Sequence, residues 1–269
     1  MAYLSDFHCH SDISPDSRTD LVDLAQAAVQ KGVQEMCVTE HWECGSPCLD
    51  WQLRKKPFDA ARYLERFEAA QREAGHLIGL RLGLEIGNWT QDPEHAVRGR
   101  DALPLDFVIC SLHTIKGFDA YFFDYTQENL DDYLTAYMAE CLELAREADF
   151  DSFGHLSLPL RYAMIHAQRR LSFDHCLDVV DEVLREIARR DKALEANASG
   201  FRSLGEPVPS LPLLRRFREL GGQLVTIGSD GHNEQNVGSF LLETQQVLKE
   251  AGFTRYATYE QRRPVLHAL

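Results

Sequence analysis

The sequence predicts an α/β fold built on a mainly parallel sheet, and two observations support this prediction. Short strand-like apolar runs alternate with amphipathic helical stretches from end to end of the 269-residue chain. Parallel neighbours need helical crossovers, so this alternation calls for parallel strands. The length suits a single α/β barrel, which commonly exceeds about 200 residues. No linker or repeat interrupts the pattern, and we expect one domain over residues 1–269.

Seven runs rich in β-branched, aromatic and other apolar residues are the expected strands. They are residues 3–7, 35–40, 80–86, 107–112, 150–154, 193–197 and 223–229. Stretches with apolar residues at helical spacing lie between them. These expected helices are residues 21–30, 59–74, 130–148, 176–190 and 211–220. Gly32, Gly75 and Gly221 stand where helices should end before the next strand.

The composition is that of a soluble globular protein. Hydrophobic residues make up 44% of the chain and charged residues 26%, with no long apolar run, so we expect no membrane span. The N-terminus lacks a basic segment followed by an apolar stretch, which favours a cytoplasmic location. The formal charge of −14 argues against binding of nucleic acid, because that binding depends on clustered Lys and Arg. The sequence does not determine the oligomeric state.

The seven cysteines are an odd set, scattered through the expected strands and helices. This usage is typical of reduced thiols in a cytosolic enzyme. Cys44 and Cys48 have a spacing that could bind a metal ion, but no second Cys/His pair in the sequence completes a tetrahedral site.

Residue types that bind metal ions gather at the expected carboxyl ends of the strands. In chain order they are His8, His10 and Asp16, then His41, Glu85, His113 and His155, and finally Asp230 and His232. Because the carboxyl ends of parallel strands meet at one edge, we expect these side chains to share a pocket. Taken singly, a histidine is more often a hydrogen-bonded structural residue, and the Asp-Gly-His run at 230–232 could be a turn. Their joint occurrence favours a site.

Glu85 is the strongest single indication of bound cations. It stands in the apolar run LGLEIG, where burying an unpaired carboxylate would cost several kcal/mol. Imidazole and carboxylate ligands together suit Zn²⁺, Mn²⁺ or Fe²⁺. Nine ligands are too many for one ion, so we expect two to three divalent ions with a carboxylate bridging them. Such clusters serve hydrolases, and a phosphate ester is the natural substrate.

Six motifs resemble those of one family. FHCHSDISPDS, VTEH, GLEIG, SLH, FGHLS and GSDGH occur in the order found in the PHP (polymerase and histidinol phosphatase) superfamily, and they are most similar to the histidinol-phosphate phosphatases. The resemblance implies a distorted (β/α)₇ barrel with a trinuclear metal centre. It also implies a phosphomonoesterase that hydrolyses L-histidinol phosphate in histidine biosynthesis, by attack of a metal-bridging hydroxide.

The same resemblance distributes the ligands and the catalytic roles. It assigns His8, His10, Glu85 and Asp230 to one metal, Asp16, His41 and His232 to a second, and Glu85, His113 and His155 to a third. It makes Glu85, Asp230 and His232 the catalytic residues, and Arg161 and Arg202 the residues that bind the small phosphorylated substrate. Many relatives have His where this chain has Asp16, and an Asp there should favour a harder metal than zinc.

The pocket for the leaving group is less well defined by the sequence. Glu40 and Glu195 could accommodate a substrate that carries an amine, although Glu195 could equally be a carboxylate of the barrel core. Residues 42–57 and the aromatic-rich residues 118–125 are candidates for lids over the barrel mouth, or for packing segments.

Three alternatives share part of this evidence. A phosphoesterase of the same superfamily acting on nucleotides or short oligonucleotides, or a broad-specificity phosphatase, would keep every ligand. A two-metal amidohydrolase also begins with His-x-His, but it would need eight strands and a mid-barrel Lys ligand, neither of which the sequence contains. The third alternative is a scaffold protein without activity. Missing metal-ligand residues in the six motifs would favour it, and none of these residues is missing.

Overall fold

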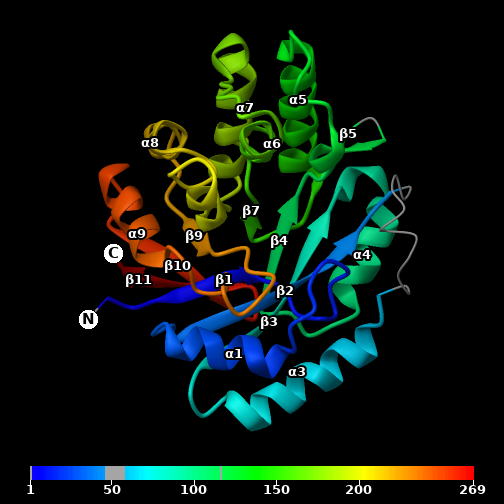
Figure 1. The fold of residues 1–269 in the computed structure, drawn as a ribbon, viewed down its shortest axis with the longest axis vertical. Coiled ribbons are helices and arrows are strands. Elements are labelled where there is room, and N and C mark those ends of the chain that lie inside the picture. Colours follow the sequence, from blue (N-terminus) through cyan, green and yellow to red (C-terminus); the bar gives the residue numbers. More distant parts are fainter. Residues whose placement is uncertain (1, 46–57, 116) are drawn as a thin grey trace.

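Seven parallel strands form the central sheet of the computed structural model, which describes residues 2–45, 58–115 and 117–269 (Figure 1). Their spatial order is β1-β2-β3-β4-β7-β8-β9. The strands are β1 (Ser5–Cys9), β2 (Glu35–Glu43), β3 (Gly79–Gly87), β4 (Phe107–Ser111), β7 (Ser152–Phe153), β8 (Ala193–Asn197) and β9 (Val225–Gly228). All seven match strands expected from the sequence.

The first and last strands of this sheet meet and nearly close it into a barrel. The N–H of Asp230 donates to the carbonyl of His8 over 2.8 Å, and the N–H of His10 donates to the carbonyl of Gly231 over 2.9 Å. Gly228 allows the approach, because a Cβ at this position would lie 2.2 Å from the Cβ of His8. The predicted distorted (β/α)₇ barrel is thus confirmed.

Helices surround the barrel (Figure 1). They are α1 (Leu21–Gln30), α3 (Ala60–Ala74), α4 (Pro93–Asp101), α5 (Asp131–Glu147), α6 (Leu158–Ala167), α7 (Leu177–Arg189), α8 (Leu211–Glu219) and α9 (Leu241–Glu250). Five of them match the expected helices to within two residues at each end. Helices α4, α6 and α9 were not predicted from the sequence. Among the described residues, no helix is long and apolar enough to cross a membrane.

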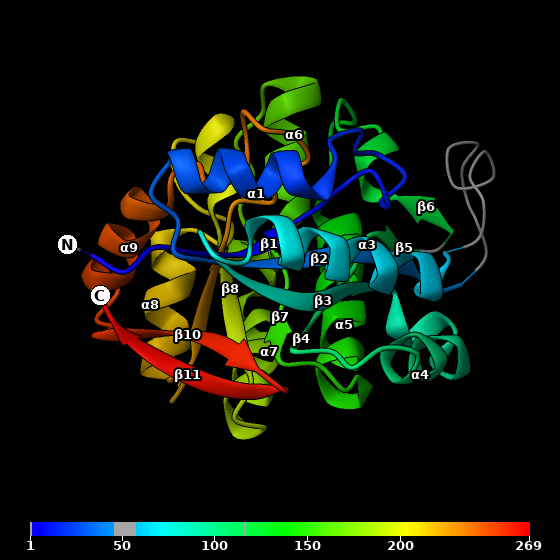
Figure 2. The same ribbon diagram turned by 90° about the horizontal axis from the view of Figure 1, so that it is seen from below.

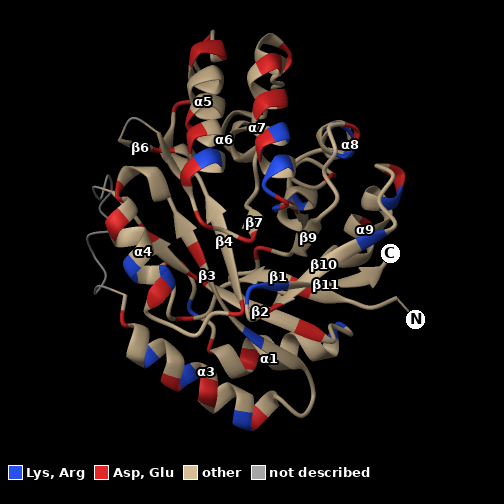
Figure 3. Cartoon of the chain, turned by 180° about the vertical axis from the view of Figure 1, so that it is seen from behind, with Lys and Arg blue, Asp and Glu red and all other residues tan. Residues whose placement is uncertain are grey.

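Local sequence explains where the predicted helices begin and which face they bury. The carboxylate of Asp20 accepts the N–H of Val22 at the start of α1, and that of Asp59 accepts the N–H of Arg62 at the start of α3. Along α7 the buried residues recur at helical spacing and face the barrel; they are Val180, Val183, Leu184 and Ile187. Figure 3 shows acidic and basic residues interspersed along the outer helices, as on α3.

An antiparallel hairpin covers the amino-terminal end of the barrel (Figure 2). Its strands are β10 (Arg255–Glu260) and β11 (Arg263–Ala268). Tyr259 and Ala257 of β10 form a buried cluster with Phe7 of β1 and Phe107 of β4. The hairpin was not predicted, and it closes the end of the barrel opposite to the expected site.

A second, smaller hairpin lies at the carboxyl end. It consists of β5 (Thr114–Ile115) and β6 (Phe118–Asp119), followed by the short helix η2 (Ala120–Phe122). The N–H of Ala120 donates to the carbonyl of His113 over 2.8 Å, which fixes this segment beside an expected ligand. The candidate lid at residues 118–125 therefore lies at the barrel mouth.

The other candidate lid is in part a strand. Trp42 belongs to β2, and its ring stacks on His95 of α4 at 4.7 Å between centroids, so Trp42 is a packing residue. Residues 46–57, including Cys48, lie outside the described residues. Cys44 is buried, and burial raises the pKa of its thiol, which disfavours the thiolate that a metal site would need.

Candidate active site

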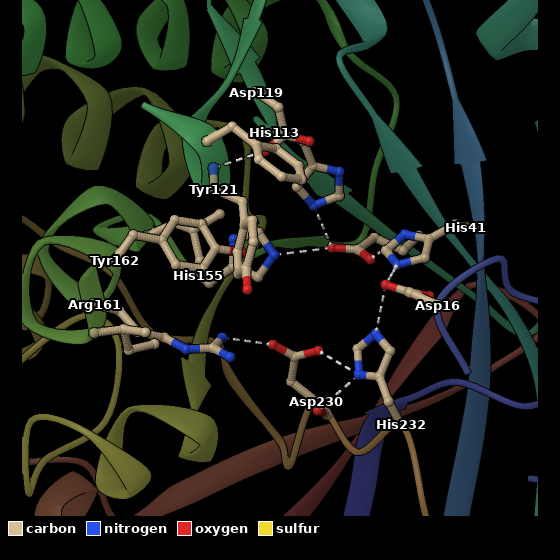
Figure 4. Close-up of a pocket in the computed structure, with 14 residues that line it drawn as sticks. Asp16, His41, His113, Asp119, Tyr121, His155, Arg161, Tyr162, Asp230 and His232 are labelled. Carbon is tan, nitrogen blue, oxygen red and sulfur yellow. Dashed lines mark hydrogen bonds and ion pairs between the residues drawn. The ribbon is translucent and has the colours of Figure 1, made fainter. Parts of the chain in front are cut away.

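The nine residues expected as metal ligands converge at the carboxyl-terminal edge of the barrel. Figure 4 shows those that line the cavity there. Three of them lie inside strands: Glu85 does so as expected, and the other two because β1 and β2 extend further than the sequence indicated. They are His8, His41 and Glu85. The other six follow strand ends, in loops; they are His10, Asp16, His113, His155, Asp230 and His232.

Glu85 lies at the centre of the group, and its two oxygens face different histidines. Its Oε1 is 2.9 Å from Nε2 of His155 and 3.2 Å from Nε2 of His113. Its Oε2 is 3.4 Å from Nε2 of His8 and 3.5 Å from Nε2 of His10. This is the arrangement that a carboxylate bridging two cations requires.

Asp16 and Asp230 are the other two carboxylates of the group. Oδ2 of Asp16 is 3.1 Å from Nε2 of His232 and 3.3 Å from Nε2 of His41. Oδ1 of Asp230 is 3.8 Å from Nε2 of His8. His41 lies between two carboxylates, because its other ring nitrogen faces Glu85. Its Nδ1 is 2.9 Å from Oε2 of Glu85, which is its register partner in the parallel pair β2–β3.

The buried polar atoms of this group indicate that it holds cations. Nε2 of His8, Nε2 of His10 and Oε2 of Glu85 are buried and have no hydrogen-bond partner. Leaving such atoms unsatisfied costs about 1–3 kcal/mol each, and a divalent cation would satisfy all three. Among the described residues, four sets of three ligand atoms lie close enough together to hold an ion: His10–His41–His232, His8–His10–Asp230, His8–Glu85–His155 and His41–Glu85–His113.

The histidines and carboxylates of the group shift one another's pKa. Burial alone would lower the pKa of His8, His41 and His113, but the carboxylates beside them hold it well above the usual value. Burial, with His41 and His232 nearby, lowers the pKa of His10 well below its usual value, so the ring is neutral at pH 7. Burial alone would raise the pKa of Glu85, but His8 and the other histidines around it hold that pKa well below the usual range. Neutral imidazole and ionised carboxylate are the forms that coordinate cations.

A cavity of about 430 Å³ opens from this group toward solvent. Its floor consists of candidate ligands: Asp16, His41, Glu85, His113, His155, Asp230 and His232. Its walls are Asp119, Tyr121 and Phe122 from the small hairpin and η2, and Leu158, Arg161, Tyr162 and Ile165 from α6 (Figure 4). The size is that of a small-molecule site.

The model of the PHP domain matches residues 6–199, which is more than half of the chain. The chain belongs to the PHP family.

Curated proteins similar to this PHP chain are aligned along nearly their whole length. The histidinol-phosphatase of Lactococcus lactis is 29% identical over 94% of this chain and 93% of that protein. The probable histidinol-phosphatase of Thermotoga maritima is 26% identical, over 92% of each chain.

Solved structures agree with the fold. The crystal structure of histidinol phosphate phosphatase from Lactococcus lactis, complexed with zinc, L-histidinol and phosphate, matches with a TM-score of 0.84 and 26% identity and covers 98% of this chain and all of that chain (100%). The structure of a putative histidinol phosphatase from Listeria monocytogenes has a TM-score of 0.74 at 18% identity, covering 87% of this chain and 97% of that one.

Two carboxylates that could have accommodated the substrate's amine instead hold two of the expected ligand histidines in place. Oε1 of Glu195 is 2.6 Å from Nδ1 of His8. Glu40 accepts the hydroxyls of Ser11 and Ser14 at 2.5 Å each, and the Ser14 hydroxyl lies 3.1 Å from Nδ1 of His10. Both carboxylates are buried and neither lines the cavity, so the substrate contact is corrected for both, and Glu195 is the carboxylate of the barrel core that the sequence also allowed.

A third carboxylate, Glu43, was missed. Its Oε1 is 2.7 Å from Nδ1 of His113, which leaves Nε2 of that ring directed at Glu85. Asn88 supports both groups, because its Nδ2 donates to Glu43 over 3.0 Å and its Oδ1 accepts the N–H of His113 over 2.9 Å. The available signal was the alternation in β2, which places Glu43 on the same side as His41.

The two arginines expected to bind phosphate differ in position. Arg161 lines the cavity, and its Nη1 donates to Oδ2 of Asp230 over 3.0 Å (Figure 4). Arg202 does not line it: its guanidinium donates to the carbonyls of Ser229 and Asp230, both at 3.3 Å, and the residue is exposed. Arg161 is therefore placed to meet an anion, and the role of Arg202 stays a prediction.

Proposed function

We propose that this chain is a metal-dependent phosphomonoesterase that hydrolyses L-histidinol phosphate to L-histidinol and phosphate, a step of histidine biosynthesis. The observation that carries the proposal is the match to the Lactococcus lactis phosphatase structure, which was obtained with zinc, L-histidinol and phosphate and covers 98% of this chain. The cavity over nine clustered potential ligands supplies a site of the required chemistry and size.

We further propose that the site binds two to three divalent ions, drawn from Mn²⁺, Zn²⁺ and Fe²⁺. Glu85 would bridge two of the cation positions. Its Oε2 would bind the cation near His8 and His10, and its Oε1 would bind the cation near His113 and His155. Asp16, with His232, would complete another position. Bound there, the cations would polarise the phosphoryl oxygens and make a coordinated water acidic enough to act as the nucleophile near neutral pH.

The chain's own residues have distinct tasks in this proposal. Glu85 holds negative charge at the centre, so the cation positions stay close together. Arg161 presents a cationic, planar group to the phosphoryl oxygens, with which it can form two hydrogen bonds. Asp230 orients Arg161 through their 3.0 Å contact and also faces His8. His232 positions Asp16 from the opposite side.

We also propose that residues 1–269 act as one domain in the cytoplasm. The hairpin β10–β11 packs its aromatic side chains against the barrel strands, so the C-terminal segment is part of the same core. Six cysteines among the described residues are buried and free, which suits a reducing compartment.

Phosphate release from four substrates tests the proposed function. The metal-free protein is reconstituted with Mn²⁺, Zn²⁺ or Fe²⁺ and assayed with L-histidinol phosphate, AMP, dTMP and 4-nitrophenyl phosphate. We expect the highest kcat/KM for L-histidinol phosphate. A higher value for either nucleotide would replace the proposed substrate by the nucleotide alternative. Equal values for all four would indicate a broad-specificity phosphatase.

A further inference from the structure

Asp119 is a carboxylate of the cavity wall that the proposed metal site does not use. It ends β6, and the residue is only 7% exposed. Its Oδ1 accepts the N–H of Tyr121 over 2.7 Å, which begins η2. The hairpin is held against the site by the hydrogen bond from Ala120 to His113, so Asp119 has a fixed place at the mouth.

Asp119 differs in its surroundings from the other carboxylates of the cavity. The other cavity carboxylates lie beside histidines or Arg161, as described above. Among the described residues, no Lys, Arg or His nitrogen forms an ion pair with Asp119. Burial raises the pKa of Asp119, which reflects the cost of keeping this charge out of water. A cation in the cavity would remove that cost.

The cavity separates two kinds of chemistry. Arg161 lies with Asp230 on one side, and Asp119 lies beside His113 on another, with Tyr121 and Tyr162 labelled between them in Figure 4. The two tyrosine rings meet edge to face at 5.3 Å between centroids. The two rings give the cavity an apolar wall beside the space between the expected metal site and Asp119.

We propose that Asp119 determines substrate specificity by binding the ammonium group of the alcohol that leaves, so that the enzyme prefers phosphomonoesters of amino alcohols. This inference rests on the proposed function for its preferred substrate, L-histidinol phosphate, and it adds the residue and the charge that select the leaving group. The ammonium would donate to the Asp119 oxygen that Tyr121 does not engage.

The test compares esters that differ only in the amine. The wild-type protein and the Asp119→Asn variant are assayed with L-histidinol phosphate and with 3-(imidazol-4-yl)propyl phosphate, which lacks the amine. Asn keeps an oxygen that can accept the N–H of Tyr121, so the hairpin should be retained. We expect the variant to lose at least about tenfold in kcat/KM on the amine substrate and to change less than about twofold on the other. Metal content should be unchanged.

Asp124→Asn is the matched control. Asp124 makes the same turn, because its Oδ1 accepts the N–H of Thr126 over 3.0 Å, but it is exposed and does not line the cavity. It should leave both kcat/KM values unchanged. An equal loss on both substrates in Asp119→Asn, or no loss on either, would overturn the inference.

A second substrate pair separates this inference from the proposed function. O-Phosphoethanolamine and ethyl phosphate also differ only in the amine. If L-histidinol phosphate proves a poor substrate, the proposed function fails. The inference then stands if the wild type prefers O-phosphoethanolamine and Asp119→Asn removes that preference, and it fails if the wild type treats the pair alike.

Discussion

Oε1 of Glu195 lies 2.6 Å from Nδ1 of His8, and Oε2 of the same carboxylate accepts the N–H of His155 over 2.7 Å. One side chain of β8 thus fixes a ring on β1 and the backbone of the loop after β7. With its proton held on Nδ1 by Glu195, His8 directs the lone pair of Nε2 toward Glu85.

Glu195→Gln should therefore weaken metal binding without unfolding the barrel. The amide has only one oxygen and cannot accept from both His8 and His155. Loss of such a supporting group typically costs about 10–100-fold in metal affinity. We expect that range in chelator-competition titrations, and activity should return at excess metal. Glu260→Gln, which changes an exposed carboxylate paired with Arg81, should leave the affinity unchanged. Unchanged affinity in Glu195→Gln would refute the positioning role.

Glu85→Ala and His113→Ala should each lose bound metal and phosphatase activity together. Both remove ligand atoms from positions that share Oε1 of Glu85. Elemental analysis and phosphate release measure the two effects. His76→Ala and His267→Ala are the controls, because His76 is exposed and His267 stacks on Tyr3 at 4.1 Å, in the hairpin at the opposite end. Full metal content in the Glu85 or His113 variant would contradict the ligand assignment.

Asp16 should influence which metal supports activity. Its carboxylate is a harder ligand than imidazole, so we expect Mn²⁺ to sustain activity in the native protein. Asp16→His should shift the ratio of Zn²⁺-supported to Mn²⁺-supported kcat/KM upward, because imidazole favours zinc. The ratio is measured after reconstitution of the metal-free protein with each ion. The same ratio in both proteins would show that Asp16 does not set the preference.

The two arginines should differ in their effect on substrate binding. Arg161→Ala removes the cation that lines the cavity, and we expect KM for the phosphate ester to rise about tenfold or more. Arg202→Ala should also raise KM, but by less, because Arg202 is exposed and donates to the carbonyls of Ser229 and Asp230. Steady-state kinetics of both variants measure the two changes in KM. Unchanged KM and kcat in Arg202→Ala would remove it from the site.

The convergence of the candidate ligands could be predicted from the sequence, because the barrel topology brings the ends of successive parallel strands to one edge. His10, His113 and His155 all follow strands, and parallel strands end at one edge, so residues far apart in the sequence meet there. The fold class followed from the same alternation of strands and helices. The register pair His41–Glu85 then makes their contact a direct consequence of neighbouring parallel strands.

Other features depended on information that no local pattern contains. The role of Glu195 stayed open between a substrate contact and a core carboxylate, because nothing in ALEAN shows that its side chain meets His8. Asp119 lies in a two-residue strand of a short hairpin, too brief for a periodic signal. Helix α6 has apolar residues around most of its circumference, so it lacks the amphipathic spacing that identified α1 and α7.

The hairpin β10–β11 covers the amino-terminal end of the barrel, so substrate and products can enter and leave the site only at its carboxyl-terminal end. In the proposed pose, phosphate lies at the bottom and the amino alcohol lies between it and the rim formed by Tyr121 and Ile165. The alcohol must then depart first, so phosphate should inhibit competitively against the ester and the alcohol noncompetitively. Product-inhibition kinetics check this order, and competitive inhibition by both products would contradict it. Because the barrel is open at one end only, its architecture determines the order in which the two products are released.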